Sequence, residues 1–80
     1  MQILRIAILE MLRQKKTLPF YPEEVVRQMY PEDWSHFIPD ILMEMKQMQE
    51  EHLISLEENN IEIVKDNYPT ILTKISPVKK

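Results

Sequence analysis

The residues best suited to proton transfer in this 80-residue chain are two histidines, His36 and His52. His36 directly follows Ser35, and neighbours on a helix point about 100° apart, so the two side chains cannot act together as nucleophile and base. The chain has no cysteine and no glycine, which leaves no thiol nucleophile and no glycine-rich phosphate loop. The sequence therefore predicts a protein that is not an enzyme and uses no cofactor.

A metal site is the other chemistry that these residue types could support. Asp33, His36 and Asp40 are spaced three and four residues apart, as ligands on one helix face would be. Pro39 interrupts that face, and no fourth ligand is evident. We interpret the three residues as polar side chains around a helix start and expect no metal.

Hydrophobic periodicity indicates the elements that would position these residues, beginning with a helix over about residues 3–14. It would end at the basic stretch 13–16, where positive charge suits a helix C-terminus. Ile6 and Leu9 widen the apolar stripe, so we expect this helix to be contacted on two sides. The stripe itself comprises Ile3, Leu4, Ala7, Ile8, Met11 and Leu12.

Prolines mark the next two helices. An extended segment around Pro19 leads to a helix over about 22–30, which begins at Pro22. Because Pro39 lies inside the next helical pattern, we expect a short turn over 32–37 and then a helix from about 39 to 51. Trp34 would pack the second helix against the third. The stripe of that third region comprises Trp34, Phe37, Ile38, Ile41, Leu42, Met45 and Met48.

From Leu53 onward the period changes to two, which is typical of strands. Strands are predicted over 54–57, 61–64 and 70–75, and either of the last two could be the main partner of the first. Without glycine, backbone sites with positive φ should fall to Asn, Asp or His. The candidates are His52 as the helix cap, Asn59-Asn60 as a tight turn, and Asp66-Asn67.

This order of elements predicts an α+β, mostly α, winged helix-turn-helix domain over residues 1–76, followed by a frayed tail at 77–80. The alternative is a three-helix bundle with a loose hairpin. The segments at 8–12, 22–27 and 30–34 resemble a family of short bacterial proteins of unknown function that are read as winged-helix-like. The likeness spans about residues 4–64, and its most specific part is Pro-Glu-Asp-Trp at 31–34. The family typically has glycine at the positions of His52 and Asn60, and Gly-Pro where this chain has Tyr68-Pro69.

In a winged helix the third helix usually enters the DNA major groove, but the charge distribution opposes that role here. Between Glu32 and Glu62 the chain has nine acidic residues, and Lys46 is the only Lys or Arg. Affinity for DNA depends on cations that displace counterions from phosphate. A DNA-binding regulator would have to use an atypical surface. That surface would comprise Arg13, Lys15, Lys16, Lys79 and Lys80.

The favoured hypothesis is a protein-interaction module that associates with itself or with a basic partner. Its contact surface would be the acidic outer face of the third helix, with Met43 as an adaptable apolar centre. The candidate residues are Asp40, Met43, Glu44, Gln47 and Glu50. The longest apolar stretch, residues 3–12, is interrupted by charges and falls short of the about 20 residues that span a membrane. We therefore expect a cytoplasmic protein that acts on no membrane and no small-molecule substrate.

Overall fold

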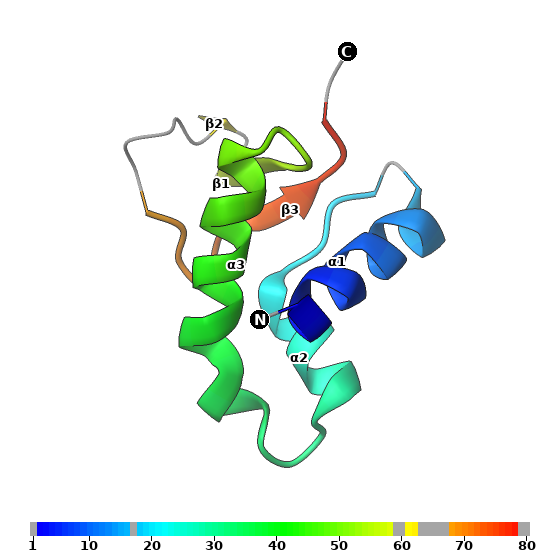
Figure 1. The fold of residues 1–80 in the computed structure, drawn as a ribbon, viewed down its shortest axis with the longest axis vertical. Coiled ribbons are helices and arrows are strands. Elements are labelled where there is room, and N and C mark those ends of the chain that lie inside the picture. The colour runs from blue at the N-terminus through cyan, green and yellow to red at the C-terminus, as the bar shows by residue number, and fades with distance from the viewer. Residues whose placement is uncertain (1, 17, 59–60, 63–67, 79–80) are drawn as a thin grey trace.

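The structure, a computed structural model, describes residues 2–16, 18–58, 61–62 and 68–78. Three helices precede a small antiparallel sheet, which is the predicted α+β winged-helix layout (Figure 1). The three α-helices are α1 (Gln2–Lys15), α2 (Pro22–Met29) and α3 (Ile38–Glu50), and the short 3-10 helix η1 (Trp34–Phe37) lies directly before α3. The strands are β1 (Ser55–Glu58), β2 (Ile61–Glu62) and β3 (Lys74–Ser76).

The start of α2 and the turn after it follow from local chemistry. Pro22 occupies the first turn of α2, as predicted, and the Glu24 carboxylate accepts a hydrogen bond of 2.8 Å from the Tyr21 backbone N–H. After α2, the ring of Tyr30 stacks on that of Phe37 with centroids 4.1 Å apart. This contact fixes the turn that leads through η1 into α3.

The end of α3 confirms the prediction for His52. His52 has φ 62°, in the left-handed region, and its N–H donates to the Gln49 carbonyl while the Leu53 N–H donates to the Met48 carbonyl. This pair of bonds is the Schellman pattern that closes a helix. Lys16, however, also has a positive φ of 58° at the end of α1. The expectation that Asn, Asp or His would fill every such site was therefore wrong.

The sheet resolves the open question of strand pairing, because β1 lies between β2 and β3 and pairs with both. Glu58 pairs with Ile61 on one side, and Leu56 pairs with Ile75 on the other. The third strand is shorter than the predicted 70–75, since residues 71–72 form a turn. The proposed turns at 59–60 and 66–67 lie outside the described residues, as do residues 79–80 of the predicted tail.

The extended segment between α1 and α2 also joins the sheet. The backbone N–H of Phe20 donates to the Ile75 carbonyl at 3.0 Å, and the Ile75 N–H donates back at 2.7 Å. Phe20 is buried. This bridge ties the helix-turn-helix part to β3, the pairing that a loose hairpin would lack.

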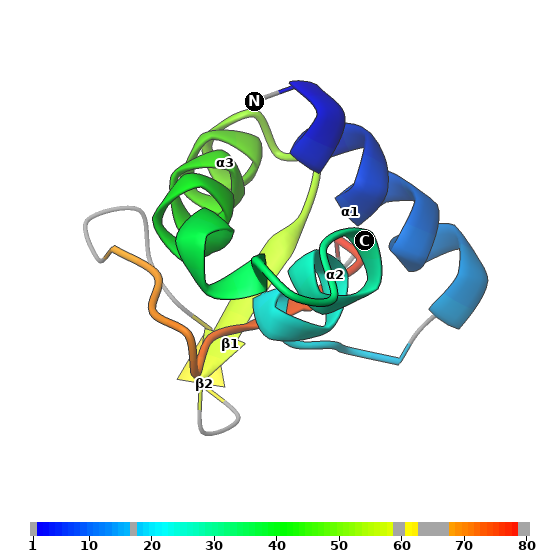
Figure 2. The same cartoon turned by 90° about the horizontal axis from the view of Figure 1, so that it is seen from below.

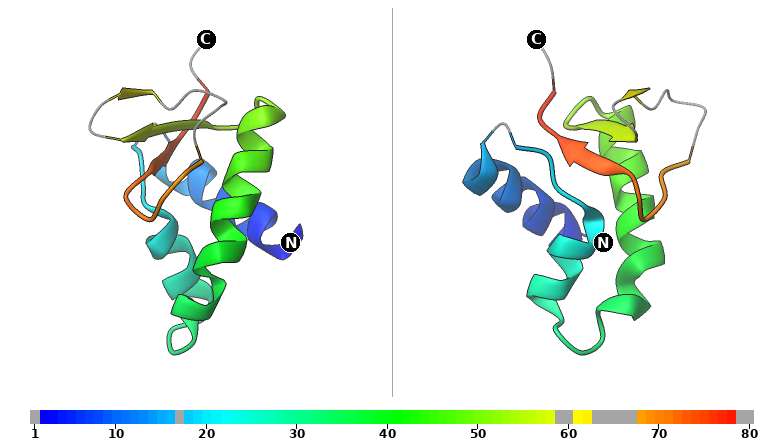
Figure 3. Two further views of the ribbon diagram at one scale, coloured as in Figure 1. Left: turned by 90° about the vertical axis from the view of Figure 1, so that its left-hand side faces the viewer. Right: turned by 180° about the vertical axis from the view of Figure 1, so that it is seen from behind.

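The core lies where the three helices meet the sheet. Figure 2 shows α2 between α1 and α3, and Figure 3 shows the strands gathered at one end of the helices. Ile6 and Leu9 stay exposed, so α1 is packed on one side only within the described chain, contrary to expectation. The buried hydrophobic residues are Leu4, Ile8, Met11, Phe20, Val25, Val26, Ile41, Met45, Met48, Ile54, Leu56 and Ile75. Of the helices in the described residues, none has the length and apolar character to cross a membrane.

Candidate functional site

Four of the five predicted partner-binding residues lie on one exposed edge of α3. Asp40, Met43, Gln47 and Glu50 follow the spacing 3, 4, 3 that keeps side chains on one helix face, and all four are exposed. We call this set the α3 ridge. Met43 is its apolar centre and is 61% exposed. Asp40 lies in the first turn of α3, where the helix dipole stabilises a negative charge.

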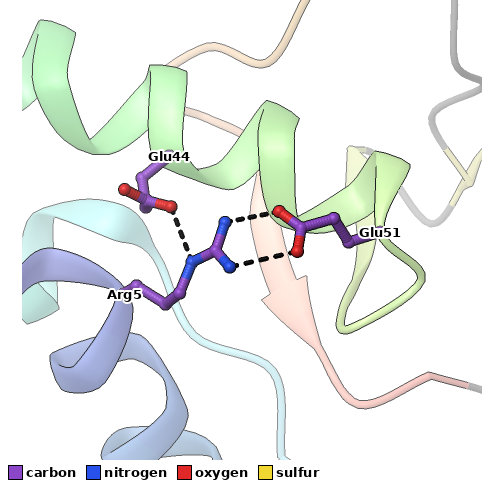
Figure 4. A network of polar contacts seen from close by, with 3 residues as sticks. All are labelled: Arg5, Glu44 and Glu51. Carbon is purple, nitrogen blue, oxygen red and sulfur yellow. Dashed lines mark hydrogen bonds and ion pairs between the residues drawn. The ribbon is translucent and has the colours of Figure 1, made fainter. Parts of the chain in front are cut away.

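Glu44, the fifth predicted residue, is not part of this surface. Its side chain turns toward α1 and is only 4% exposed, so its assignment to the outer face was wrong. Arg5 of α1 donates from Nε to Glu44 Oε2 at 2.9 Å. The same guanidinium donates from Nη1 and Nη2 to both carboxylate oxygens of Glu51, at 3.1 and 2.5 Å (Figure 4). The Arg5–Glu44–Glu51 cluster thus joins α1 to the middle of α3 and to the residue that follows its end.

The carboxyls of this cluster have lowered pKa values. Burial alone would raise the pKa of Glu44, but favourable hydrogen bonds and charge attraction, those from Arg5 among them, outweigh it and lower the pKa. For Glu51 the hydrogen bonds from Arg5 lower the pKa directly. Both glutamates are therefore held in the charged form, and their role is to fix the helices.

Gln47 lies where the ridge meets this cluster. It lines an open hollow of about 370 Å³ together with Gln2, Arg5 and Glu44. Glu50, at the end of the ridge, has Lys46 as a neighbour at 3.9 Å, a distance that leaves the pair loose. The ridge therefore presents two carboxylates, an amide and a thioether, with one cation at its side.

The basic residues proposed for nucleic acid are largely engaged with glutamates. Arg13 pairs with Glu10 one turn away, and Lys15 Nζ lies 3.0 Å from Glu24 Oε1. Lys16 is exposed at the end of α1. Lys79 and Lys80 lie outside the described residues. The three basic residues that the structure describes, Arg13, Lys15 and Lys16, therefore lie at one end of α1. Two of them, Arg13 and Lys15, already have a carboxylate partner.

The strands β1 and β2, which form the wing of this fold, add further acidic residues rather than basic ones. Glu57 lies directly opposite Glu62 across β1 and β2, and opposite Lys74 across β1 and β3. Glu58 Oε1 accepts hydrogen bonds from the hydroxyls of Thr70 (2.9 Å) and Thr73 (3.2 Å), which anchors the segment before β3. Within the described strands Lys74 is the only Lys or Arg, so they carry little positive charge to place against phosphate.

The residues considered for catalysis and metal binding occupy other roles. Trp34 packs against the core, and the Arg27 guanidinium of α2 lies 4.2 Å from its ring centroid, in line with the predicted structural role. His36 is exposed in η1, and His52 caps α3. Within the described ranges, no group of three or more His, Cys, Asp or Glu side chains is placed to hold a metal ion.

Sequence reasoning missed the Arg5–Glu44 contact, although a signal was present. On an ideal helix Glu44 lies only about 60° from Ile41, on the apolar side, whereas Met43 lies about 200° away. Arg5 in turn interrupts an otherwise apolar stretch of α1. Two opposite charges within two apolar stripes indicate a buried pair.

Comparisons with known proteins add no family to this description. No family model, no curated protein and no solved structure matches the chain.

Proposed function

We propose that this winged-helix domain is a non-enzymatic interaction module that binds a basic protein segment through the α3 ridge. The observation that carries the proposal is the exposed Met43, flanked on the same edge of α3 by Asp40, Gln47 and Glu50. An adaptable apolar side chain between carboxylates suits a partner that alternates apolar and basic residues. The partner would meet the helix that winged-helix proteins commonly present to their targets.

The charge distribution supports a protein partner over DNA. Arg5, Arg13, Lys15, Arg27 and Lys46 each form an ion pair with a glutamate. Binding to phosphate through these cations would require breaking pairs that the fold already makes. The alternative, a winged-helix regulator that contacts DNA through an atypical surface at the end of α1, rests on the fold and on Lys16.

A synthetic amphipathic helix of lysine and leucine is a suitable probe for the ridge. We expect Asp40→Lys combined with Glu50→Lys to weaken its binding at least about tenfold, a loss of about 1.4 kcal/mol, because attraction becomes repulsion. Glu62→Lys reverses one charge in β2, away from the ridge, and so makes half of the charge change of the double variant. It should change the affinity less than about twofold at physiological salt, where charges are screened beyond about 8 Å.

The same titration with a mixed-sequence DNA duplex at about 50 mM salt distinguishes the two functions, because phosphate binding is strong there. Amide shifts from DNA in α3 or the hairpin would overturn the proposal in favour of a regulator. Shifts confined to residues 13–16 would support the atypical DNA surface instead. Equal loss of peptide binding in the Glu62→Lys control would show that net charge, and not the ridge, attracts the peptide.

A cytoplasmic location accords with this function. The chain contains no cysteine, so it needs no oxidising compartment to stabilise its fold. Fractionation of cells that express the tagged protein would test the location. Recovery with the membrane or secreted fraction would contradict it.

A further inference from the structure

Three exposed apolar side chains form a stripe along the outer side of α1. Ile3, Ile6 and Leu9 are 51%, 58% and 41% exposed and follow one another at intervals of three residues. Figure 2 shows α1 along an outer side of the molecule, with α2 and α3 on its inner side. We call these three residues the α1 stripe. Single exposed apolar residues are ordinary, whereas three at intervals of three on one helix form a row that a partner surface can cover.

An apolar hollow lies beside the stripe, between α1 and α2. It has a volume of about 150 Å³ and is lined by Ala7, Met11, Val25 and Met29, with Glu10 and Gln28 among the polar residues at its border. An apolar cavity of about this size is large enough to hold a benzene ring, so it accommodates a branched aliphatic side chain. The two methionines let its walls adapt to the guest.

The charge distribution indicates which kind of molecule would bind to this surface. The chain carries a net charge of −3, and its acids gather between Glu32 and Glu62. On the stripe side of α1, Glu10 and Arg13 pair with each other, and the exposed Lys16 follows at the end of the helix. A basic partner is drawn to the acidic α3 ridge and not to this side, which has no excess of acidic residues. Two copies of the acidic chain, by contrast, repel each other least when they approach through it.

We propose that the α1 stripe and the adjoining hollow form a two-fold interface with a second copy of this chain. In such an interface the same patch serves both copies, so it must carry both halves of each contact. The α1 side has both halves: the exposed Ile6 side chain of one copy would enter the hollow beside Met11 and Met29 of the other copy. The inference concerns a different surface from the α3 ridge and does not depend on the proposed function.

The expected association is weak. α1 has 14 residues and is about 21 Å long, so one helix with its neighbouring hollow falls below the about 800 Å² per partner of a standard interface. We expect a dissociation constant of about 10 µM to 1 mM, which corresponds to an exchanging dimer.

Sedimentation velocity over about 10 µM to 1 mM protein tests the proposal in that range. The full chain should shift from monomer toward dimer as its concentration rises, and Ile6→Lys should weaken the association at least about tenfold. Met43→Lys is the matched control, because Met43 is equally exposed at 61% but lies on the α3 ridge. A monomer throughout the range, assembly beyond a dimer, or equal weakening by Met43→Lys would overturn the proposal.

A second measurement checks the contact itself. In a mixture of differently labelled copies, isotope-filtered NMR should detect intermolecular contacts from the Ile6 methyls of one copy to Met11 or Met29 methyls of the other. Filtered contacts that involve the α3 ridge instead would contradict the assignment. Ile6→Lys should leave binding of the basic peptide unchanged, which separates a failure here from a failure of the proposed function.

Discussion

The acidic residues on the two sides of α3 have different roles. On the side that faces α1, Glu44 is buried and bound to Arg5. On the outer edge, Asp40 and Glu50 are exposed beside Met43. The first carboxylate holds two helices together, whereas the others are available to a partner. Acidic composition alone therefore does not define a binding surface, because the position of each carboxylate around the helix decides its role.

The largest effect should come from removing the buried carboxylate. We expect Glu44→Ala to lower the free energy of unfolding by about 2 kcal/mol, because Arg5 loses a charge-assisted hydrogen bond in a largely buried place. Glu50→Ala, on the outer edge, should change it by less than about 0.5 kcal/mol. Urea denaturation measures both values. Equal losses for the two variants would remove the distinction between the sides.

Lowering the pH should reduce the stability that Glu44 and Glu51 supply through their contacts with Arg5. The pKa values of Glu44 and Glu51 lie below the ordinary glutamate value of 4.5. The unfolded chain therefore binds protons first as the pH falls, and the stabilisation, present above about pH 4.5, is lost as the pH drops through the folded-state values. Thermal melts between pH 7 and pH 3 should show this decline. Glu51→Gln should flatten it, and an unchanged slope in that variant would contradict the role of the cluster.

A smaller effect is expected where α3 ends. His52 has a Cβ atom in the left-handed region, a conformation that glycine adopts without steric cost. We expect His52→Gly to raise the free energy of unfolding by about 0.5–1 kcal/mol, the steric relief less the greater entropy lost on folding. His52→Ala keeps the Cβ and should bring no such gain. A loss of stability in His52→Gly would show that the imidazole makes contacts that outweigh the strain.

The smallest effect concerns the wing, where two acids face each other. Glu62 lies directly opposite Glu57, and like charges at such positions repel. Glu62→Thr should raise the free energy of unfolding by about 0.3 kcal/mol at low salt, and the gain should shrink as salt is added. Paired urea titrations at low and high salt measure it. A gain independent of salt would point to strand propensity rather than charge.

Much of the fold was predictable because its signals are local. Pro22 and Pro39 set the starts of two helices, and His52 was identified as a cap from the absence of glycine. The order of helices and strands predicted the winged-helix layout. These features depend on a few neighbouring residues, which the sequence displays directly.

The features that were missed depend on contacts between distant segments. Ile71 and Leu72 suggested a strand, but Thr70 and Thr73 bind Glu58, and the chain turns between them. Lys16 has a positive φ although its type gives no indication of it. The pairing of β1 with two strands and the bridge at Phe20 likewise depend on contacts between segments that are distant in the sequence.

The candidate site was predicted in part. Asp40, Met43, Gln47 and Glu50 share the exposed edge, as their spacing indicated. Glu44 does not share that edge, because its angular position beside Ile41 places it on the buried side of α3. Whether the ridge binds a partner stays a prediction, since spacing defines a surface and not what contacts it.

The most direct test of the central claim is an amide-shift map of the labelled protein titrated with the lysine–leucine peptide. We predict that the shifts concentrate at Asp40, Met43, Gln47 and Glu50 and leave the exposed side of α1 unchanged. Shifts spread over the acidic wing, or no shifts at all, would contradict the claim that the outer edge of α3 is the surface this protein offers to a partner.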